Sequence, residues 1–552
     1  MYEQHKETLE SYMMKLIDKA NQDKDYNIWI VPPSYKAIKP YVDRLSQLDP
    51  GQYPLWGIPF AVKDNIDVAG YPTTAGCKAY SYMPQKNAEV VQKLIDAGAI
   101  PVGKTNLDQF ATGLVGVRSP YGPTRNALNP ELISGGSSSG SAVAVARGQA
   151  VFALGTDTAG SGRVPAGLNK LIGFKPSVGN WSNDGVVPAC ALLDCVTVFT
   201  TQIEDAFLID EIVRQGRSGM NYTGASEYPK RILLPRNKLQ FYGPYAEQYE
   251  AAWEKSVDRV KGLGLPIAYV DTGIFSKAAE LLYDGPWIAE RWSDLGSFVL
   301  SHEGDVHPVT KEVLESAVKR GYDAASVFTA LHSLEEYKKA ITPMMKDSVL
   351  VLPTCGGTWT IEQVLGDPIR TNSAMGIYTN HCNLLQLSAI AIPGEDAGKD
   401  LPFGITLFAE HQQEKYLHAV SKLFAESEMM ELAVCGLHMQ GFALEKQLLD
   451  LEAEFIRKDR TAETYKLIRL NTEPSKPGLI RVDRGGASIA LEVWKMKVKH
   501  IGQFLRQIPS PLGIGNIELA DGSIVKGFIC EGYAESSSED ITRYGGWRAL
   551  YS

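Results

Sequence analysis

The sequence predicts a mixed α/β protein: a central sheet with helices on both faces, followed by a small α+β domain. Helical stretches alternate with short apolar strands between residues 87 and 175, and again beyond residue 246. Repeated helix–strand units of this kind are typical of a sheet covered by helices on both faces. After about residue 435 closely spaced strands and a hairpin follow, which indicates a second domain.

The first helix–strand pair begins at Asn87. Apolar residues at 90, 91, 94 and 95 share one face of a helix that Asn87 can cap and Gly98 ends. The segment IPVG then favours a strand, because it is apolar and short. Further pairs are expected from a small-residue helix at 141–147 before VFALG, a helix at 248–261 before IAYVD, the strand SVLVLP at 348–353 and a helix at 413–432.

The end of the chain has a different pattern. YKLIRL, LIRV and IALEVWKM are strand-like, and a hairpin is expected to turn at Asp521–Gly522, a dipeptide typical of tight turns. We therefore expect residues 1–434 to form one large domain and residues 436–552 a second, small one. A chain of 552 residues is long enough to bury two such cores.

The composition excludes some classes of function. A net charge of −9 argues against a general nucleic-acid binder, although a local basic pocket stays possible. No run of 18 apolar residues occurs and the N-terminus lacks the apolar core of a signal peptide, so we expect no membrane association. Seven cysteines without a CxxC pair favour reduced thiols in the cytoplasm. The sequence contains no metal-ligand spacing such as HExxH, so we expect neither a metal nor another cofactor.

Two short motifs are misleading in their context. Residues 98–105 match the phosphate-loop pattern GxxxxGK[ST], but a helix precedes them and Ile-Pro-Val favours a strand. Residues 136–140 match the nucleophile elbow GxSxG, but the loop-like NALNPELISG stands where a buried strand is required. We therefore expect neither nucleotide binding nor an α/β-hydrolase site.

Two turns rich in glycine and serine carry the chemistry that we expect. They are GGSSSGSA at 135–142 and GTDTAGSGRVPAG at 155–167. Two further segments precede them in the chain: GIPFAVKDNIDVAG at 57–70 and GAIPVGKTNLDQFA at 98–111. Glycine lets backbone N–H groups approach a ligand closely, and serine supplies a reactive hydroxyl. In order and spacing the four segments resemble the amidase signature family, whose members hydrolyse or transfer amides with a Ser–Ser–Lys triad. The resemblance implies the amidase signature fold.

The resemblance assigns the triad to three residues. Ser161 stands where the family has its nucleophile, Ser137 aligns with the bridging serine 24 positions before it, and Lys63 aligns with the lysine base. A serine hydroxyl needs a neighbouring base before it can attack an amide. Lysine serves as that base only when neutral, which requires burial to lower its pKa by about 3 units, or ~4 kcal/mol. The apolar run IPFAVK fits such burial.

The resemblance also implies an oxyanion hole made by backbone N–H groups. These belong to Thr158, Ala159, Gly160 and Ser161. One departure is visible, because Ala159 stands where many members have a second glycine. We expect its methyl group to modulate the rate rather than abolish activity.

The substrate is implied by a closer resemblance to the allophanate hydrolase branch of the family. It rests on LLYDGPWIAERWS at 281–293, LLQLSAIAIPGEDAG at 384–398 and three segments of the C-terminal domain, GLHMQGFAL, SKPGLIRV and IPSPLGIGNIELADGSIVKGFICE. It implies that Tyr283 and Arg291 bind allophanate, with the guanidinium of Arg291 suited to a bidentate grip on a carboxylate. The alternative is that both residues only pack on a helix, since they are eight positions apart.

In the C-terminal domain, His438 corresponds to a histidine of the family domain. Two roles stay open for it: a part in decarboxylation and a purely structural role. The sequence departs from the family pattern just after it, at Ala443–Glu445. The resemblance further implies a homodimer and functional coupling to a urea carboxylase. Two other functions stay open: a glutamine-type amidase that supplies ammonia to a partner, and an inactive scaffold whose C-terminal domain binds other proteins. The first does not account for the C-terminal domain, and retention of Lys63, Ser137 and Ser161 argues against the second.

Overall fold

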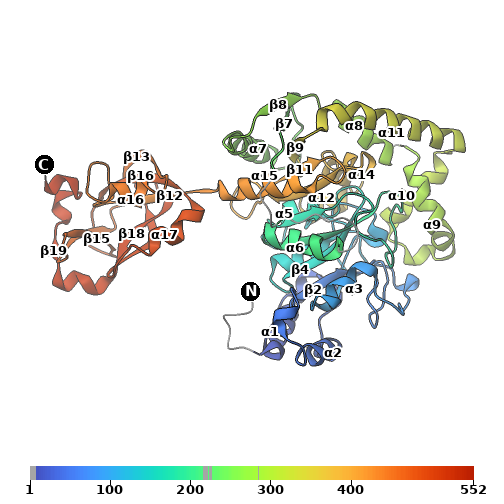
Figure 1. Ribbon diagram of the computed structural model, residues 1–552, viewed down its shortest axis with the longest axis horizontal. Coiled ribbons are helices and arrows are strands. Elements are labelled where there is room, and N and C mark those ends of the chain that lie inside the picture. Colours follow the sequence, from blue (N-terminus) through green and yellow to red (C-terminus); the bar gives the residue numbers. More distant parts are fainter. Residues whose placement is uncertain (1–7, 215–221, 223–226, 284, 552) are drawn as a thin grey trace. The chain divides into compact units, whose positions relative to one another are not determined.

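The computed structural model describes residues 8–214, 222, 227–283 and 285–551 (Figure 1). The chain divides into two compact units, residues 1–422 and 423–552. Within the described residues, no helix has both the length and the apolar character needed to cross a lipid bilayer.

The first unit is built on one mixed sheet of eleven strands, with helices around it (Figure 1). Strand β2 pairs in parallel with β3 and β4, and β7 pairs in parallel with β8 and β9, whereas the strands between these two groups are antiparallel. In sheet order the strands are β1 (Trp29–Val31), β3 (Ile100–Thr105), β2 (Pro59–Lys63), β4 (Phe152–Asp157), β6 (Cys195–Thr200), β5 (Ile172–Lys175), β10 (Ser388–Pro393), β11 (Gly404–Ala409), β9 (Ser348–Pro353), β7 (Arg231–Pro235) and β8 (Ile267–Val270).

The helices of this unit cover a sheet in which several strands are buried on both faces. Every residue of β2, β3 and β4 is buried, as expected for strands packed between two layers. The helices are α1 (Leu9–Gln22), α2 (Tyr35–Leu45), α3 (Glu89–Asp96), α4 (Ser139–Ala146), α5 (Val164–Leu168), α6 (Ile203–Arg214), α7 (Ala246–Lys261), α8 (Gly273–Tyr283), α9 (Trp287–Ser301), α10 (Pro308–Lys319), α11 (Ala324–Met345), α12 (Ile361–Gly366), α13 (Arg370–Met375), α14 (His381–Leu384) and α15 (Glu414–Glu426).

The second unit is an α+β domain with two small sheets. Five strands form one sheet in the order β13 (Glu454–Arg460), β16 (Ala490–Lys497), β12 (Met429–Val434), β18 (Ile524–Cys530) and β17 (Leu512–Glu518). The other contains β15 (Lys476–Arg481), β14 (Tyr465–Leu470) and β19 (Glu539–Asp540), and the helices are α16 (Glu445–Leu449) and α17 (Ile501–Leu505). The hairpin β17–β18 encloses Asp521 and Gly522 with Glu518 opposite Ile524, which confirms the predicted turn.

The predicted mixed α/β fold class is therefore confirmed, with two local corrections. Helix α15 ends at Glu426 and not near 432, because Met429–Val434 pairs as β12 with β16 and β18. The two compact units divide at 422/423, within α15. Asn87 does not cap α3, whose N-cap is Ala88; the Asn87 Oδ1 accepts a hydrogen bond from the Ala69 N–H instead. Residues 100–105 of the apparent phosphate loop form β3, as predicted.

Candidate active site

Lys63 is the last residue of β2 and its side chain is completely buried. Its Nζ donates hydrogen bonds to Ser137 Oγ at 2.8 Å and to Thr156 Oγ1 at 2.7 Å. Ser137 is 74 residues away in sequence, and Thr156 lies on β4, the parallel neighbour of β2. The structure thus brings together two of the three residues expected to form the triad.

Burial determines the charge state of this lysine. It lowers the pKa of Lys63 from an ordinary value of 10.5 to about 7, although the carboxylates of Asp194, Asp108 and Asp157 act in the opposite direction. Arg291 repels the ammonium and lowers this pKa further. Near pH 7 a large share of Lys63 is therefore neutral, and its lone pair can accept the proton of a serine.

Ser137 is fixed by the loop around it, and the Gly136–Ser137 peptide bond is cis. The Ser137 carbonyl accepts a hydrogen bond from the Asp108 N–H at 3.1 Å. The Asp108 carboxylate accepts three more from the backbone N–H groups of Val115, Gly116 and Arg118. A Cβ on Gly136 would lie 2.1 Å from Asp108 Oδ2, so only glycine allows this approach.

The turn that carries Ser161 is organised by a buried ion pair. Asp157 ends β4 and forms two hydrogen bonds of 2.9 Å with the guanidinium of Arg163. Burial alone would raise the pKa of Asp157, but Arg163, Lys175 and the Gly162 N–H together outweigh it and hold that pKa below its ordinary value. The Ser161 hydroxyl has no hydrogen-bond partner among the residues that the structure describes, and Ser161 is 3% exposed. It is therefore not tied to another group of the turn.

Asp157 also reduces the number of N–H donors available for the expected oxyanion hole. The Gly160 N–H donates to Asp157 Oδ1 at 2.9 Å, so this donor is committed within the turn and is not free for an oxyanion. The N–H groups of Thr158, Ala159 and Ser161 make no such bond within the described part of the chain. Gly160 has a different function. Its φ is +140°, and a Cβ at this position would lie 2.3 Å from the Thr379 side chain, so both the backbone and the packing require glycine.

Asp194 is a buried acid that sequence reasoning did not identify. Its carboxylate accepts a hydrogen bond from the Thr158 hydroxyl and two from the N–H groups of Ala189 and Cys190. Burial raises its pKa, and it is the carboxyl group that most strongly raises the pKa of Lys63. Asp194 lies outside the four family segments, so no motif pointed to it. Thr156 was missed although it lies inside the segment 155–167.

Arg291 lies on α9 and is 3% exposed. Its Nη1 donates to Thr112 Oγ1 at 3.2 Å, and its charge lowers the pKa values of Lys63 and Asp194. It therefore lies close enough to Lys63 for its charge to act on that residue. Tyr283 ends α8, but its side chain lies outside the described residues.

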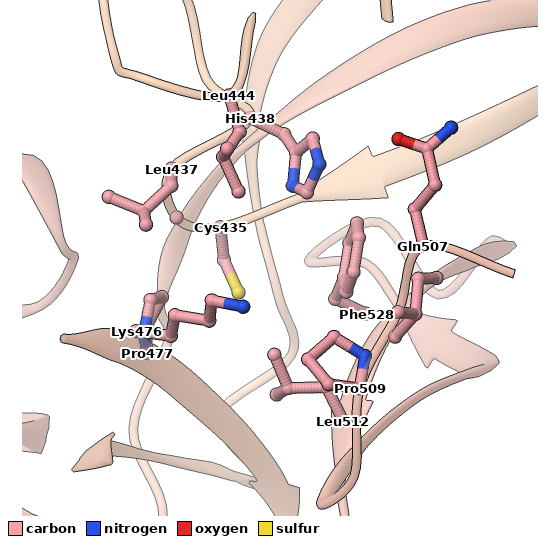
Figure 2. A pocket seen from close by; sticks show the side chains of 12 residues that line it. Cys435, Leu437, His438, Leu444, Lys476, Pro477, Gln507, Pro509, Leu512 and Phe528 are labelled. Carbon is pink, nitrogen blue, oxygen red and sulfur yellow. The ribbon is translucent and has the colours of Figure 1, made fainter. Parts of the chain in front are cut away.

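His438 lies in the second unit and lines a pocket there (Figure 2). Its Nε2 lies 2.9 Å from Gln447 Oε1, and its ring stacks on Phe528 with centroids 4.9 Å apart. Because an amide oxygen accepts, Nε2 carries the proton and Nδ1 is an acceptor. Burial lowers the pKa of His438, and nearby Lys476 adds to this effect. Figure 2 shows the Lys476 ammonium on the opposite side of the pocket from Gln507.

In the described part of the chain, no group of three or more histidine, cysteine, aspartate or glutamate side chains is placed to hold a metal ion. All seven cysteines are free thiols, and all are buried.

Comparison with known proteins identifies the family. A model of the amidase family matches residues 7–417, and a model of the allophanate hydrolase C-terminal domain matches residues 430–552. The chain belongs to the amidase family. It is an amidohydrolase with the amidase signature fold and an additional C-terminal domain.

Three similar proteins show how far this likeness extends. Urea amidolyase of Saccharomyces cerevisiae is 38% identical over 588 residues, which cover 97% of this chain and 32% of that protein. The solved structure of Kluyveromyces lactis allophanate hydrolase is 36% identical with a TM-score of 0.71, and covers 99% of this chain and 97% of that one. A glutamyl-tRNA(Gln) amidotransferase subunit of Carboxydothermus hydrogenoformans is 45% identical over 416 residues, 69% of this chain and 84% of that protein.

The chain spans about a third of the length of the urea amidolyases that it matches. By contrast, it matches the K. lactis allophanate hydrolase structure over nearly the whole of both chains. The likeness to this amidase therefore includes the C-terminal unit and is not limited to the catalytic core.

Proposed function

We propose that this amidase hydrolyses the terminal amide of allophanate through an acyl-enzyme formed on Ser161. The observation that carries the proposal is the hydrogen bond of 2.8 Å between Lys63 Nζ and Ser137 Oγ, made by a lysine whose pKa is lowered to about 7. A neutral lysine hydrogen-bonded to a serine is the arrangement that a proton relay needs. Similarity to K. lactis allophanate hydrolase over the full chain supports the choice of substrate.

In the proposed first step, Ser161 attacks the carbonyl of the terminal amide and passes its proton through Ser137 to Lys63. The N–H groups of Thr158, Ala159 and Ser161 stabilise the oxyanion, since Gly160 is committed to Asp157. Ammonia leaves after Lys63 returns the proton through Ser137. Water then attacks the acyl-enzyme, and the product is an N-carboxylated carbamate.

The proposed substrate contact is an ion pair between Arg291 and the carboxylate of allophanate. Its support is the burial of Arg291 and its electrostatic interaction with both Lys63 and Asp194. An anionic substrate offsets the cost of burying this guanidinium next to a lysine. Tyr283 is proposed as a second substrate-binding residue from the family resemblance alone.

For the second unit, we propose that the pocket around His438 acts on the N-carboxylated carbamate. Neutral His438 presents an acceptor nitrogen, and among the described residues Lys476 is the one cation that lines the pocket, which suits a carboxylated product. Loss of one carbon dioxide, with protonation of the nitrogen, gives carbamate, and carbamate then breaks down to a second carbon dioxide and the second ammonia. A structural role for His438, fixed by Gln447 and Phe528, is the alternative.

The remaining proposals concern organisation. We assign amide cleavage to the domain expected at residues 1–434 and the second reaction to residues 436–552, and we propose a homodimer in the cytoplasm. Seven free thiols support a reducing compartment. Coupling to a urea carboxylase is supported by the urea amidolyases, which extend well beyond the part that this chain matches.

A glutamine-specific amidase that supplies ammonia to a partner is the second candidate. The observation in its favour is the 45% identity with an amidotransferase component, which covers only 69% of this chain. An inactive scaffold is disfavoured by the intact hydrogen bond between Lys63 and Ser137.

The decisive experiment compares ammonia release from allophanate, malonamide and glutamine with the purified full chain. The proposal expects kcat/KM for allophanate to exceed the other two values by at least about tenfold. Allophanate carries its carboxylate one nitrogen away from the amide carbonyl, whereas malonamide has none and that of glutamine is three carbon atoms away. A preference for glutamine would contradict the proposal and support the second candidate. No ammonia from any of the three would support the scaffold.

A further inference from the structure

A cavity of about 180 Å³ lies at the carboxyl ends of three parallel strands in the first unit. Because β7 pairs in parallel with both β8 and β9, the C-terminal ends of these strands meet at one edge of the sheet. The cavity is lined there by Asn237 after β7, Thr272 after β8 and Leu352 in β9. In open α/β sheets this end of the strands is where ligands commonly bind. None of the expected triad residues lines this cavity.

Several of the polar groups that line the cavity offer hydrogen-bond donors to a ligand. Asn237 Oδ1 already accepts from the Thr272 N–H at 3.0 Å and from its hydroxyl at 2.8 Å, so the amide nitrogen is the part left for a ligand. Lys238 also lines the cavity and is largely exposed, and Glu250, which is not a lining residue, lies 3.8 Å from its Nζ. The first turn of α8 contributes Ser276, and this end of a helix favours negative charge. No carboxylate is among the lining residues that the structure describes.

His381 is the most buried polar residue among those lining the cavity. It is 1% exposed, and its ring packs between Phe275 and Phe408 with centroid distances of 5.0 and 4.9 Å. Its buried Nε2 has no hydrogen-bond partner among the described residues. Burial lowers its pKa to about 3, so the ring is neutral at pH 7. A buried polar atom without a partner is unfavourable, and a bound group that accepts a hydrogen bond from this ring would remove that cost.

We propose that this cavity binds a small carboxylate-type anion, which accepts hydrogen bonds from His381 and Asn237 and pairs with Lys238. A carboxylate presents acceptors only, which matches a lining of donors without an acidic side chain. The volume is that of about six water-sized groups, enough for a carboxylate with a few carbon atoms.

The cavity shares a segment with the turn that carries Ser161. Two residues before His381, the Thr379 carbonyl accepts hydrogen bonds of 3.2 Å from the Arg163 guanidinium. Two residues after it, Asn383 Nδ2 donates to the Asp157 carbonyl at 2.7 Å. A ligand that holds His381 therefore also restrains residues 379–383, which contact the Asp157–Arg163 pair. We expect occupancy to change kcat rather than KM.

Acetate is the probe, and thermal unfolding with isothermal titration calorimetry measures its binding to the full chain at constant ionic strength. Wild type is expected to show saturable binding and a melting temperature higher by a few degrees. Lys238→Met is expected to weaken binding at least tenfold, and His381→Phe to abolish it while preserving the ring packing. The matched control is Lys230→Met, an exposed lysine paired with Asp347, which is expected to bind as wild type does.

Lys238 is a surface residue, so its variant tests the site even if His381→Phe fails to fold. Acetate binding that both variants retain would overturn the proposal, as would no binding up to about 100 mM, which would mean that the cavity holds only water. Binding needs no turnover, so the proposal stands or falls independently of the substrate. For the coupling, acetate is expected to change kcat in wild type and not in Lys238→Met; an equal change in both would overturn it.

Discussion

Lys63 in the first unit and Lys476 in the second have very different surroundings. Lys63 is completely buried, donates to two hydroxyl groups, and has three carboxylates in electrostatic contact. Lys476 is half-buried at the wall of a pocket, next to a histidine held by one side-chain hydrogen bond (Figure 2). Burial turns the first lysine into a base, whereas the second keeps access to water and serves as a fixed positive charge. The first site is therefore arranged to accept a proton from a serine, and the second is arranged to hold an anion beside a histidine.

The largest effect is expected from Ser161→Ala. Loss of the nucleophile should reduce ammonia release from allophanate more than about 100-fold, with an unchanged melting temperature, because the hydroxyl makes no hydrogen bond within the described structure. The matched control is Ser301→Ala, whose exposed hydroxyl bonds only to its own helix and its neighbour. More than about 1% residual activity would show that Ser161 is not the nucleophile.

Arg291→Lys should have the next largest effect. A lysine keeps the charge but loses the bidentate geometry, so KM for allophanate should rise by about tenfold, and far less for uncharged malonamide. Steady-state kinetics with both substrates measure this difference, with the exposed Arg370→Lys as the control. Equal increases in KM for the two substrates would refute carboxylate recognition by Arg291.

A third change tests whether the two units act in sequence. His438→Phe retains the aromatic contacts with Phe528 and Phe504 but removes both ring nitrogens. The first ammonia should be released at the normal rate, while the initial yield should fall from two ammonia molecules per allophanate towards one. A coupled assay that follows ammonia and carbon dioxide separately measures this, with His500→Gln as the control in the same unit. Unchanged stoichiometry would support the structural role of His438.

The sequence was sufficient to predict those features that depend on local pattern. The mixed sheet, the strand at residues 100–105 and the hairpin at Asp521–Gly522 follow from periodicity and turn chemistry. The prediction that the helix extends to residue 432 was wrong, since α15 ends at Glu426. Pairing with a strand some sixty positions later decides the conformation of Met429–Val434. Non-local pairing of this kind overrides local propensity and leaves no local signal.

The same distinction applies to the site. Lys63, Ser137 and Ser161 were identified from family segments, and the contact of the first two could be anticipated. The hydrogen bond from the Gly160 N–H to Asp157 could not be anticipated from the sequence. The position of this carboxylate depends on its pairing with Arg163, which is known only from the folded turn. Asp194 was missed because it lies 33 positions beyond Ser161 and becomes relevant only through burial beside Thr158.

The smallest expected effect concerns the pKa of Lys63 itself. Neutral Lys63 is the base, so kcat/KM should rise with pH through an apparent pKa of about 7. Arg291 lowers this pKa, so Arg291→Gln should move the rise to higher pH by less than about one unit, whereas Arg291→Lys keeps the charge and should not move it. Malonamide is the substrate for these profiles, because its binding needs no carboxylate contact. The stability of the fold depends on pH for the same reason. Because Lys63 binds its proton more weakly in the folded than in the unfolded state, the free energy of unfolding should increase between about pH 7 and 10.5. This part of the increase should be absent in Lys63→Met. Identical pH profiles for wild type and Arg291→Gln would show that the charge of Arg291 does not act on Lys63. The electrostatic link between the proposed base and the proposed substrate-binding cation would then be refuted.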